Sequence, residues 1–167
     1  MKSRYHDNGS TLSDILIEMN RMKENQMNEL VDGAKESYFR WLDSFNRRDF
    51  TGMLDEMHFP HLRISGKNEL QIWENREDHE LHLRGTSNRL VDENWKKTIS
   101  ENVTALQSGP NKVHLSMKQY RVNTMNQNYN IFDTLWIFIL ENGSWGVKFR
   151  ASYLSASSEV INSVSSD

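Results

Sequence analysis

The segment MHFPHLRIS, Met57–Ser65, gathers the side chains of this chain that are best suited to chemistry. On an extended strand His61, Arg63 and Ser65 would share one face, because successive side chains point to opposite sides. A histidine titrates near neutral pH and can act as a general acid or base. An arginine offers a fork of donors to a carboxylate, an enolate or a phosphate. In the structural alternative, His61 caps backbone groups beside Pro60 and Arg63 pairs with a surface acid.

Asp133 is the acid that could act together with His61. It lies in the segment IFDTLWIFIL, where its own face of a strand is otherwise apolar. Burial would raise the pKa of such a carboxyl group, so that it could donate a proton near neutral pH. The alternative places Asp133 near the open start of the strand, where it meets water, Arg121 or Arg150.

Four further residues carry large amphipathic rings that could line a pocket for an organic ligand. Aromatic residues at helical spacing also occur as ordinary core, so both interpretations stay open. The four residues are Tyr38, Trp41, Trp73 and Tyr120.

Two His-x-x-His pairs, His58/His61 and His79/His82, invite comparison with a metal site. The string HELH is one residue short of the HExxH zinc motif. Pro60 prevents His58 and His61 from lying on one face of a helix. No carboxylate ligand is suitably spaced nearby, and the chain has no cysteine. We therefore expect no metal and no cofactor. His58 is assigned to the last turn of a helix, where a cation suits the helix dipole.

Composition narrows the class of protein. The chain has 167 residues, 37% of them hydrophobic, which suits one compact domain. The net charge of −3 and the pI near 6.1 argue against a nucleic-acid partner, which requires a basic surface. The first ten residues lack the apolar region of a signal peptide, and the longest apolar run, Leu135–Leu140, is too short to span a bilayer. We expect a cytoplasmic protein with no membrane partner.

The hydrophobic periodicity predicts helices first and then a run of strands. A thin apolar stripe, rich in methionine, indicates an amphipathic helix outside the main core, and Pro60 should end the third helix. The expected helices cover residues 11–27, 34–45, 50–57 and 74–85, and the expected strands cover 62–73 as a hairpin, then 95–107, 112–123, 131–141 and 145–154. Residues 1–10 and the serine-rich tail from Ser155 should be loose.

The segment IFDTLWIFIL is apolar on both faces of the strand that it predicts. A half-exposed antiparallel strand would alternate apolar and polar residues, so both of its faces should be covered. Helices can cover one face. A second copy of the same sheet is the economical cover for the other face, which predicts a homodimer.

Three segments carry a resemblance to a known family: YFRWLDSFNRRDFTGMLDEM, HFPHLRISGKNELQIW and LWIFILENGSWGVKFRASY. In these segments the chain resembles the nuclear transport factor 2-like superfamily, which includes SnoaL-type polyketide cyclases and ketosteroid isomerases. The resemblance implies an α+β cone in which a curved antiparallel sheet wraps around N-terminal helices, with an extra helix added here. It divides the chain into an extension at 1–28, the domain at 29–155 and a disordered tail at 156–167.

The resemblance further implies an apolar pocket that opens at one end of the cone. The isomerases place an aspartate base, a tyrosine and a protonated aspartic acid around that pocket. The matching positions of this chain hold Ser65, Trp41 and Trp136 or Ile137. All three positions depart from the isomerase pattern, so the resemblance does not imply that mechanism.

Two functions follow as hypotheses. In the first, a dimeric domain binds a small apolar or aromatic molecule whose polar or acidic group is anchored by Arg63 and His61. In the second, an isomerase, dehydratase or cyclase uses His61 as base, Asp133 as acid and Arg63 to stabilise an oxyanion. A third interpretation treats the methionine-rich first helix as an arm for a protein partner.

Overall fold

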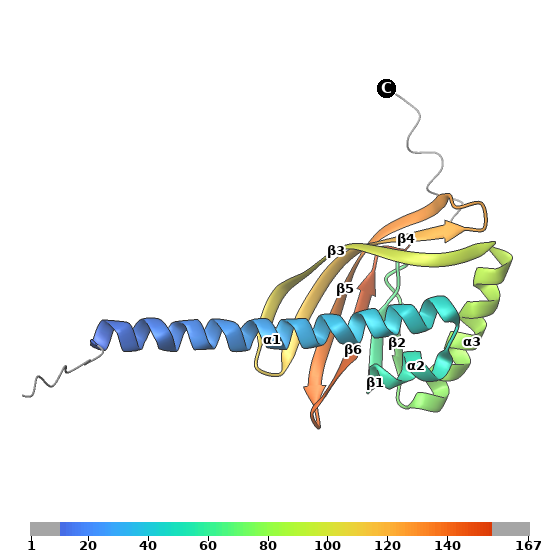
Figure 1. Cartoon of the computed structure of the whole chain (residues 1–167). Coiled ribbons are helices and arrows are strands. Elements are labelled where there is room, and N and C mark those ends of the chain that lie inside the picture. The colour runs from blue at the N-terminus through green and yellow to red at the C-terminus, as the bar shows by residue number, and fades with distance from the viewer. Residues whose placement is uncertain (1–10, 155–167) are drawn as a thin grey trace, which may run out of the picture.

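A computed structural model describes residues 11–154, which form a long helix, two shorter helices and a curved six-stranded sheet (Figure 1). The predicted loose start at residues 1–10 and the predicted tail from Ser155 lie outside the described residues. The helices are α1 (Leu12–Arg47), α2 (Phe50–Asp55) and α3 (Arg76–Asp92). The strands are β1 (Met57–Ile64), β2 (Leu70–Trp73), β3 (Trp95–Gly109), β4 (Lys112–Asn123), β5 (Asn128–Glu141) and β6 (Ser144–Ser152).

The sheet has the strand order β2-β1-β6-β5-β4-β3, and its longest strands are consecutive in the chain. All neighbours are antiparallel except β1 and β6, which run parallel and bring Arg63 opposite Arg150. In Figure 1 the concave face of the sheet curves around the C-terminal part of α1, while α2 and α3 lie at one end of the sheet. This arrangement confirms the expected α+β cone.

Helix α1 is one continuous helix of 36 residues, whereas the sequence predicts two separate helices over residues 11–27 and 34–45. Thr11 and Asp14 form the capping box that starts it, and Arg48 ends it in a left-handed conformation. Gly33 does not interrupt α1, because one helical glycine costs only about 1 kcal/mol relative to alanine. Its missing side chain is needed for packing, since a Cβ atom there would lie 2.6 Å from Nε1 of Trp145.

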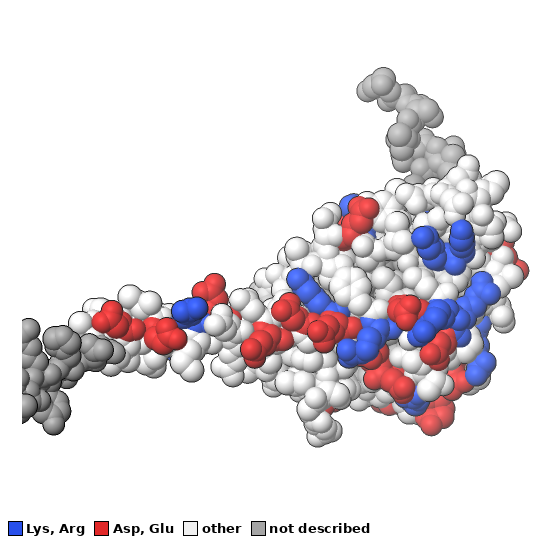
Figure 2. Space-filling model, viewed as in Figure 1, with Lys and Arg blue, Asp and Glu red and all other residues white. Residues whose placement is uncertain are grey.

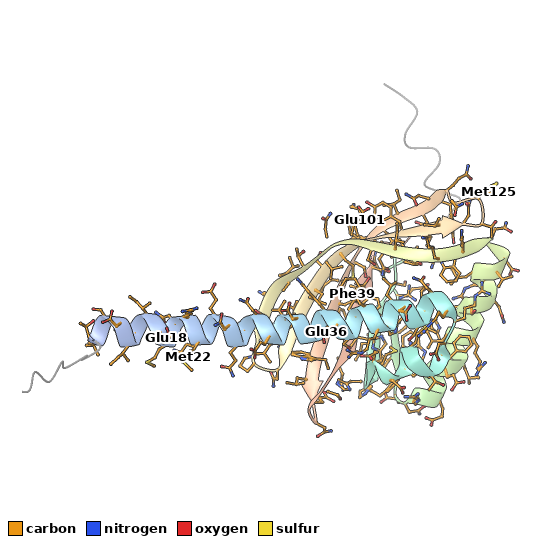
Figure 3. All side chains as sticks on the ribbon, in the orientation of Figure 1. Glu18, Met22, Glu36, Phe39, Glu101 and Met125 are labelled. Carbon is orange, nitrogen blue, oxygen red and sulfur yellow. The ribbon has the colours of Figure 1, made fainter. Side chains whose placement is uncertain are left out.

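The N-terminal part of α1 projects from the body as an arm, which we define as residues 12–29 (Figures 1 and 3). Its apolar stripe is exposed: Ile15 retains 48% and Met22 63% of its accessible surface. The labelled side chains of Glu18 and Met22 stand on this projecting part, away from the sheet, in Figure 3. The expected helix outside the main core is therefore present, as the first half of a longer helix.

The core fills the space between the inner face of the sheet and the C-terminal half of α1. Trp136 of β5 packs edge-on against Tyr38 and Trp41 of α1, with ring centroids 5.2 and 4.8 Å apart. The other core residues are mostly aliphatic side chains of β4, β5, β6 and α2. These aromatic contacts fix the distance between α1 and the sheet, and so set the shape of the hollow beside them.

Pro60 has a different place from the one expected. Helix α2 ends at Asp55, five positions earlier, and Pro60 lies within β1. The parallel pairing of β1 with β6 is irregular between Met57 and Leu62, so a residue without an amide donor is accommodated there. His58 also belongs to β1, not to a helix, and its Nε2 lies 3.2 Å from the carbonyl oxygen of Ser144.

Charged side chains of both signs are mixed on the face shown in Figure 2, including along the arm. On this face no broad basic field is present. No helix among residues 11–154 has the length and apolar character needed to cross a membrane.

Candidate functional site

A cavity of about 80 Å³ lies between the inner face of the sheet, the end of α1 and one face of α3. Its walls combine aromatic rings, hydroxyl and amide groups, and three arginines. The lining residues from helices are Trp41, Phe45, His82, Leu83 and Thr86; those from strands and from the segment after β6 are Arg63, Thr98, Gln119, Arg121, Phe132, Thr134, Trp136, Arg150, Ser152 and Leu154.

The cavity meets a wider outer hollow of about 450 Å³, which we call the vestibule. Arg63, Thr86, Arg121 and Leu154 line both spaces and so form a neck between them. Beyond the neck, the vestibule is lined by Ser65, Gly66, Lys67, Glu69, Arg89, Leu90 and Glu93. The buried cavity therefore has a way out toward the surface of the protein.

Arg150 of β6 is the most unusual group in the cavity. Only 9% of its surface is exposed, and its guanidinium lies 5.3 Å from the ring centre of Trp41 and 5.0 Å from that of Trp136. Among residues 11–154, no carboxylate forms an ion pair with it. Burial and the nearby Arg63 lower the pKa of Arg150 to about 9, so the group remains charged at neutral pH.

His61 holds Arg150 in place. The Nε of Arg150 always carries a proton and lies 3.1 Å from Nε2 of His61, so that ring nitrogen must accept. The proton of the imidazole is then on Nδ1, which donates to the carbonyl oxygen of Val147 at 3.2 Å. Burial, and next the charge of Arg150, lower the pKa of His61 to about 2. His61 is therefore a neutral positioning residue, and neither ring nitrogen is free to act as general base.

Arg63 and Arg121 add positive charge at the neck. Burial and the charge of Arg121 lower the pKa of Arg63, which forms no ion pair within the described range. Arg121 does have an acidic partner: its Nη1 lies 2.9 Å from Oε2 of Glu93, which also accepts a hydrogen bond from Tyr129. Within residues 11–154, Arg63 and Arg150 are thus the two cavity cations that lack a counter-charge.

Three histidines stack behind this charged group. The ring centres of His61 and His79 are 5.1 Å apart, those of His79 and His82 are 5.6 Å apart, and Trp73 packs on His79 at 4.4 Å. His79 is fully buried, and neither of its ring nitrogens has a hydrogen-bond partner among the residues that the structure describes. Burial, and next the charge of Arg150, lower the pKa of His79 and bring that of His82 to about 4. The cluster is therefore neutral at pH 7.

A short chain of polar groups borders the other side of the cavity. Tyr38, which is fully buried, forms a hydrogen bond with Ser100 through its hydroxyl group. The same hydroxyl accepts a hydrogen bond from Nε2 of Gln119 at 2.9 Å. Burial raises the pKa of Tyr38, so its hydroxyl remains neutral. Of this group, Gln119 reaches the cavity wall.

The structure separates Asp133 from His61. Asp133 alternates along β5 with the buried Phe132 and Thr134, so it lies on the outer face of the sheet. Its side chain is 63% exposed and forms an ion pair with Lys118 at 3.1 Å. Neither Arg121 nor Arg150 is its partner. Because His61 faces the interior, the two expected acid–base residues cannot reach one bound atom.

The other predicted site residues divide into three groups. Trp41 and Arg63 line the cavity, and Ser65 lines the vestibule, where its Oγ accepts from backbone amides of the turn. Tyr38 and Trp73 lie behind the wall as packing residues. Tyr120 lies on the outer face, and its hydroxyl donates to Glu101 at 2.9 Å. Tyr38, Trp73 and Tyr120 are thus outside the set of residues that line the cavity.

Sequence reasoning missed Arg150 as the central group. The only available signal was a basic residue within the segment SWGVKFRAS, which is otherwise rich in apolar residues. Within residues 11–154, no group of three or more metal-ligating side chains is arranged to hold a metal ion. The cavity instead suits a molecule that carries negative charge, because fixed guanidinium groups recognise carboxylates and phosphates.

Comparisons with known proteins agree on the fold. A ketosteroid isomerase-like protein from Erwinia carotovora atroseptica aligns with a TM-score of 0.59 and 12% identity over 77% of this chain and 98% of its own. An NTF2-like protein with a cystatin-like fold from Novosphingobium aromaticivorans aligns with a TM-score of 0.62 and 12% identity over 87% and 90% of the two chains. A protein of unknown function from Nostoc punctiforme aligns with a TM-score of 0.60 and 15% identity over 75% and 90%.

No family model matches the sequence, and no curated protein matches it. The identities to the solved structures are low, so these alignments describe the architecture and not an activity. The chain has the nuclear transport factor 2-like, or cystatin-like, cone fold.

Proposed function

We propose that this protein binds a small organic molecule through an acidic group, which enters the cavity and is held by Arg150 and Arg63. One observation carries the proposal. Arg150 is a buried cation without a carboxylate partner among the described residues, and it faces an enclosed space. Burial of an unpaired charge is costly, so a protein that keeps one in a cavity gains from an anion there.

The position of Arg150 favours recognition over a purely structural role. Trp41 and Trp136 pack against the flat guanidinium, and His61 accepts from its Nε. Arg150 lines the cavity, and no described residue accepts a hydrogen bond from its terminal nitrogens, which leaves these donors for a carboxylate or a phosphate. The indole rings beside them provide apolar surface for the rest of the ligand.

A binding role also fits what the site lacks. The enzyme hypothesis requires His61 and Asp133 to act on one atom, and these residues lie on opposite sides of the sheet. The Nε2 lone pair of His61 is already used by Arg150. The described cavity wall contains no aspartate or glutamate that could replace Asp133. Binding is therefore the function that these side chains support best.

A thermal-shift comparison of matched acids and amides tests this function. We expect benzoate and naphthoate to raise the melting temperature, and benzamide and naphthamide to leave it unchanged, because only the acids can neutralise Arg150. Acid at about 100 times its Kd should add about 2.7 kcal/mol to the free energy of unfolding. In Arg63→Gln the shift should shrink, whereas Arg84→Gln on the exposed side of α3 should respond like wild type. Equal shifts with acids and amides would refute the proposal.

We also propose that the outer face of the sheet binds a second copy of the chain. The residues of β5 that face away from α1 are mainly apolar: Ile131 is 47% exposed, and Leu135, Ile137 and Ile139 are only partly buried. The side chains of this face are thus only partly shielded by their neighbours among the described residues. A two-fold axis would place the same face of both copies together and remove it from water.

Light scattering coupled to size-exclusion chromatography checks the assembly. We expect a dimer of about twice 19.7 kDa for the wild type and a monomer for Ile137→Lys, since a charge on the buried patch opposes pairing. Leu16→Lys in the exposed arm is the matched control and should remain dimeric. If Leu16→Lys dissociates the protein and Ile137→Lys does not, the interface lies on the arm.

A further inference from the structure

The cavity and its neck carry more positive charge than one acidic group would neutralise. Three arginines line the cavity, and none of its described lining residues is an aspartate or a glutamate. Glu93 neutralises Arg121 through an ion pair of 2.9 Å. His82, the remaining ionisable group in the wall, has its pKa lowered to about 4 by burial and by Arg150, and is neutral at pH 7. Arg63 and Arg150 therefore leave two positive charges.

These two charges come from adjacent strands. Arg63 of β1 and Arg150 of β6 are direct partners in the parallel register, and both side chains reach the cavity. Neighbouring strands are about 4.8 Å apart, so the two side chains leave the backbone close together on one face of the sheet. Like charges at such spacing repel each other. The folded protein retains this repulsion, because no carboxylate among the described residues pairs with Arg63 or Arg150.

The two arginines differ in depth along the same passage. Arg150 lines only the inner cavity, where it contacts Trp41 and Trp136, whereas Arg63 lines both the cavity and the vestibule. A ligand group at Arg150 is therefore enclosed, and a group at Arg63 lies at the neck. In the vestibule Glu93 pairs with Arg121, and Lys67 and Arg89 are accompanied by Glu69, so the outer space has an excess of one positive charge apart from Arg63, against two in the cavity.

We infer that the natural ligand is a small dianion, either an aromatic dicarboxylate or a phosphate monoester, that neutralises Arg150 and Arg63 together. The inference rests on the proposed function and specifies the ligand of the same site. A dicarboxylate places one group at Arg150 and one at Arg63, and a phosphate monoester offers two charges on a single group. Both share the chemistry that paired guanidinium forks recognise.

Matched probes that differ by one charge test the inference. The first pairs are phthalate, isophthalate and terephthalate, each against the carbamoylbenzoate of the same substitution pattern. The second pair is phenyl phosphate against methyl phenyl phosphate. Dissociation constants are measured by calorimetry with wild-type protein at pH 7.5 and at constant ionic strength, because salt screens such interactions. We expect at least one dianion to bind ten or more times more tightly than its monoanionic match.

Variants assign the second charge to Arg63. In Arg63→Gln both probes should bind more weakly than to wild type, and the dianion should lose at least ten times more affinity than its monoanionic partner, so that the preference for the dianion disappears. Arg84→Gln removes one positive charge from an exposed site and should keep the full preference. A larger gain in affinity for a dicarboxylate over its monoanionic match would identify the ligand as a dicarboxylate. A larger gain for phenyl phosphate would identify it as a phosphate monoester.

The outcomes separate this inference from the function on which it depends. Equal affinity for monoanions and dianions in the wild type would overturn the inference and leave anion binding intact. A preference for dianions that persists in Arg63→Gln would also overturn it, because the second charge would then be recognised elsewhere. Absence of binding by every probe, charged once or twice, would overturn both proposals.

Discussion

Replacing Arg150 by methionine should abolish the binding of aromatic acids while leaving a folded protein. Arg150 is the enclosed cation of the cavity, and its loss removes the charge that compensates for taking an anion out of water. Removing one member of a buried, hydrogen-bonded charge pair costs about 2–5 kcal/mol of binding. Because about 1.4 kcal/mol is a factor of ten, calorimetry should show an affinity at least 30 times weaker.

Two opposing effects keep the Arg150→Met protein stable. The variant removes a buried charge, which favours the folded state. It also leaves Nε2 of His61 without its donor, which costs about 1–3 kcal/mol. The free energy of unfolding in urea should therefore change by less than about 2 kcal/mol. This measurement separates lost binding from lost folding.

A conservative variant gives the matched control for Arg150. Arg150→Lys keeps a positive charge but loses the planar fork and the packing between Trp41 and Trp136. We expect binding intermediate between that of wild type and Arg150→Met. Unchanged affinity in both variants would place the anion site elsewhere in the protein.

The free energy of unfolding should fall steeply as the pH drops below about 6. His61, His79 and His82 are neutral in the folded protein, and their pKa values lie below the unfolded value of about 6.5. An unfolded chain binds protons at these histidines before the folded chain does. Stability from these groups is thus complete above pH 6.5 and is lost as the pH falls toward the folded pKa values, about 4 for His82 and about 2 for His61.

The size of this effect follows from the number of protons taken up on unfolding. Each fully buried histidine contributes about 1.4 kcal/mol per pH unit within its window, so His61 and His79 together contribute about 2.7 kcal/mol per unit. His82 is partly exposed and adds less. Urea unfolding at pH 7, 6, 5.5 and 5 measures the slope. A slope of less than one proton would contradict the neutral cluster.

Two variants assign the slope to the histidine cluster. His79→Leu removes a buried imidazole whose nitrogens have no hydrogen-bond partner, so it should lower the slope by about one proton. The same change should not lower stability at pH 7, because an unsatisfied polar group is replaced by an apolar one. His114→Gln on the outer face of the sheet should keep the wild-type slope.

Local patterns predicted most of the elements because each of them depends on nearby residues. The break at Arg47–Asp49 is confirmed as the junction of α1 and α2, where Asp49 caps α2. The turns after Gln107 and Glu141 also join strands as expected. The periodicity could not show that α1 continues through Gly33. A glycine is required there because the ring of Trp145, more than a hundred residues away, occupies the space that a side chain would need.

The site shows the same division between local and distant information. Strand alternation placed Arg63 on one face with His61 and Ser65, the resemblance implied that this face meets a pocket, and Arg63 does line a cavity. The expected partner Asp133 faces outward, because the neighbouring Phe132 and Thr134 pack inward. Which face of β5 meets α1 depends on packing between elements, and either face of that apolar strand could have done so.

By itself, the amino-acid sequence determined the order of the elements, the likeness to a cone-shaped fold and the presence of an inward-facing arginine on the first strand. Only the tertiary structure decided what that arginine meets. The parallel pairing of β1 with β6 joins residues far apart in the chain and sets Arg150 beside Arg63. In the same arrangement Nε2 of His61 accepts a hydrogen bond from Arg150, so His61 is not available as the base that the sequence suggested. Such contacts depend on strand register, which no local pattern in this chain encodes.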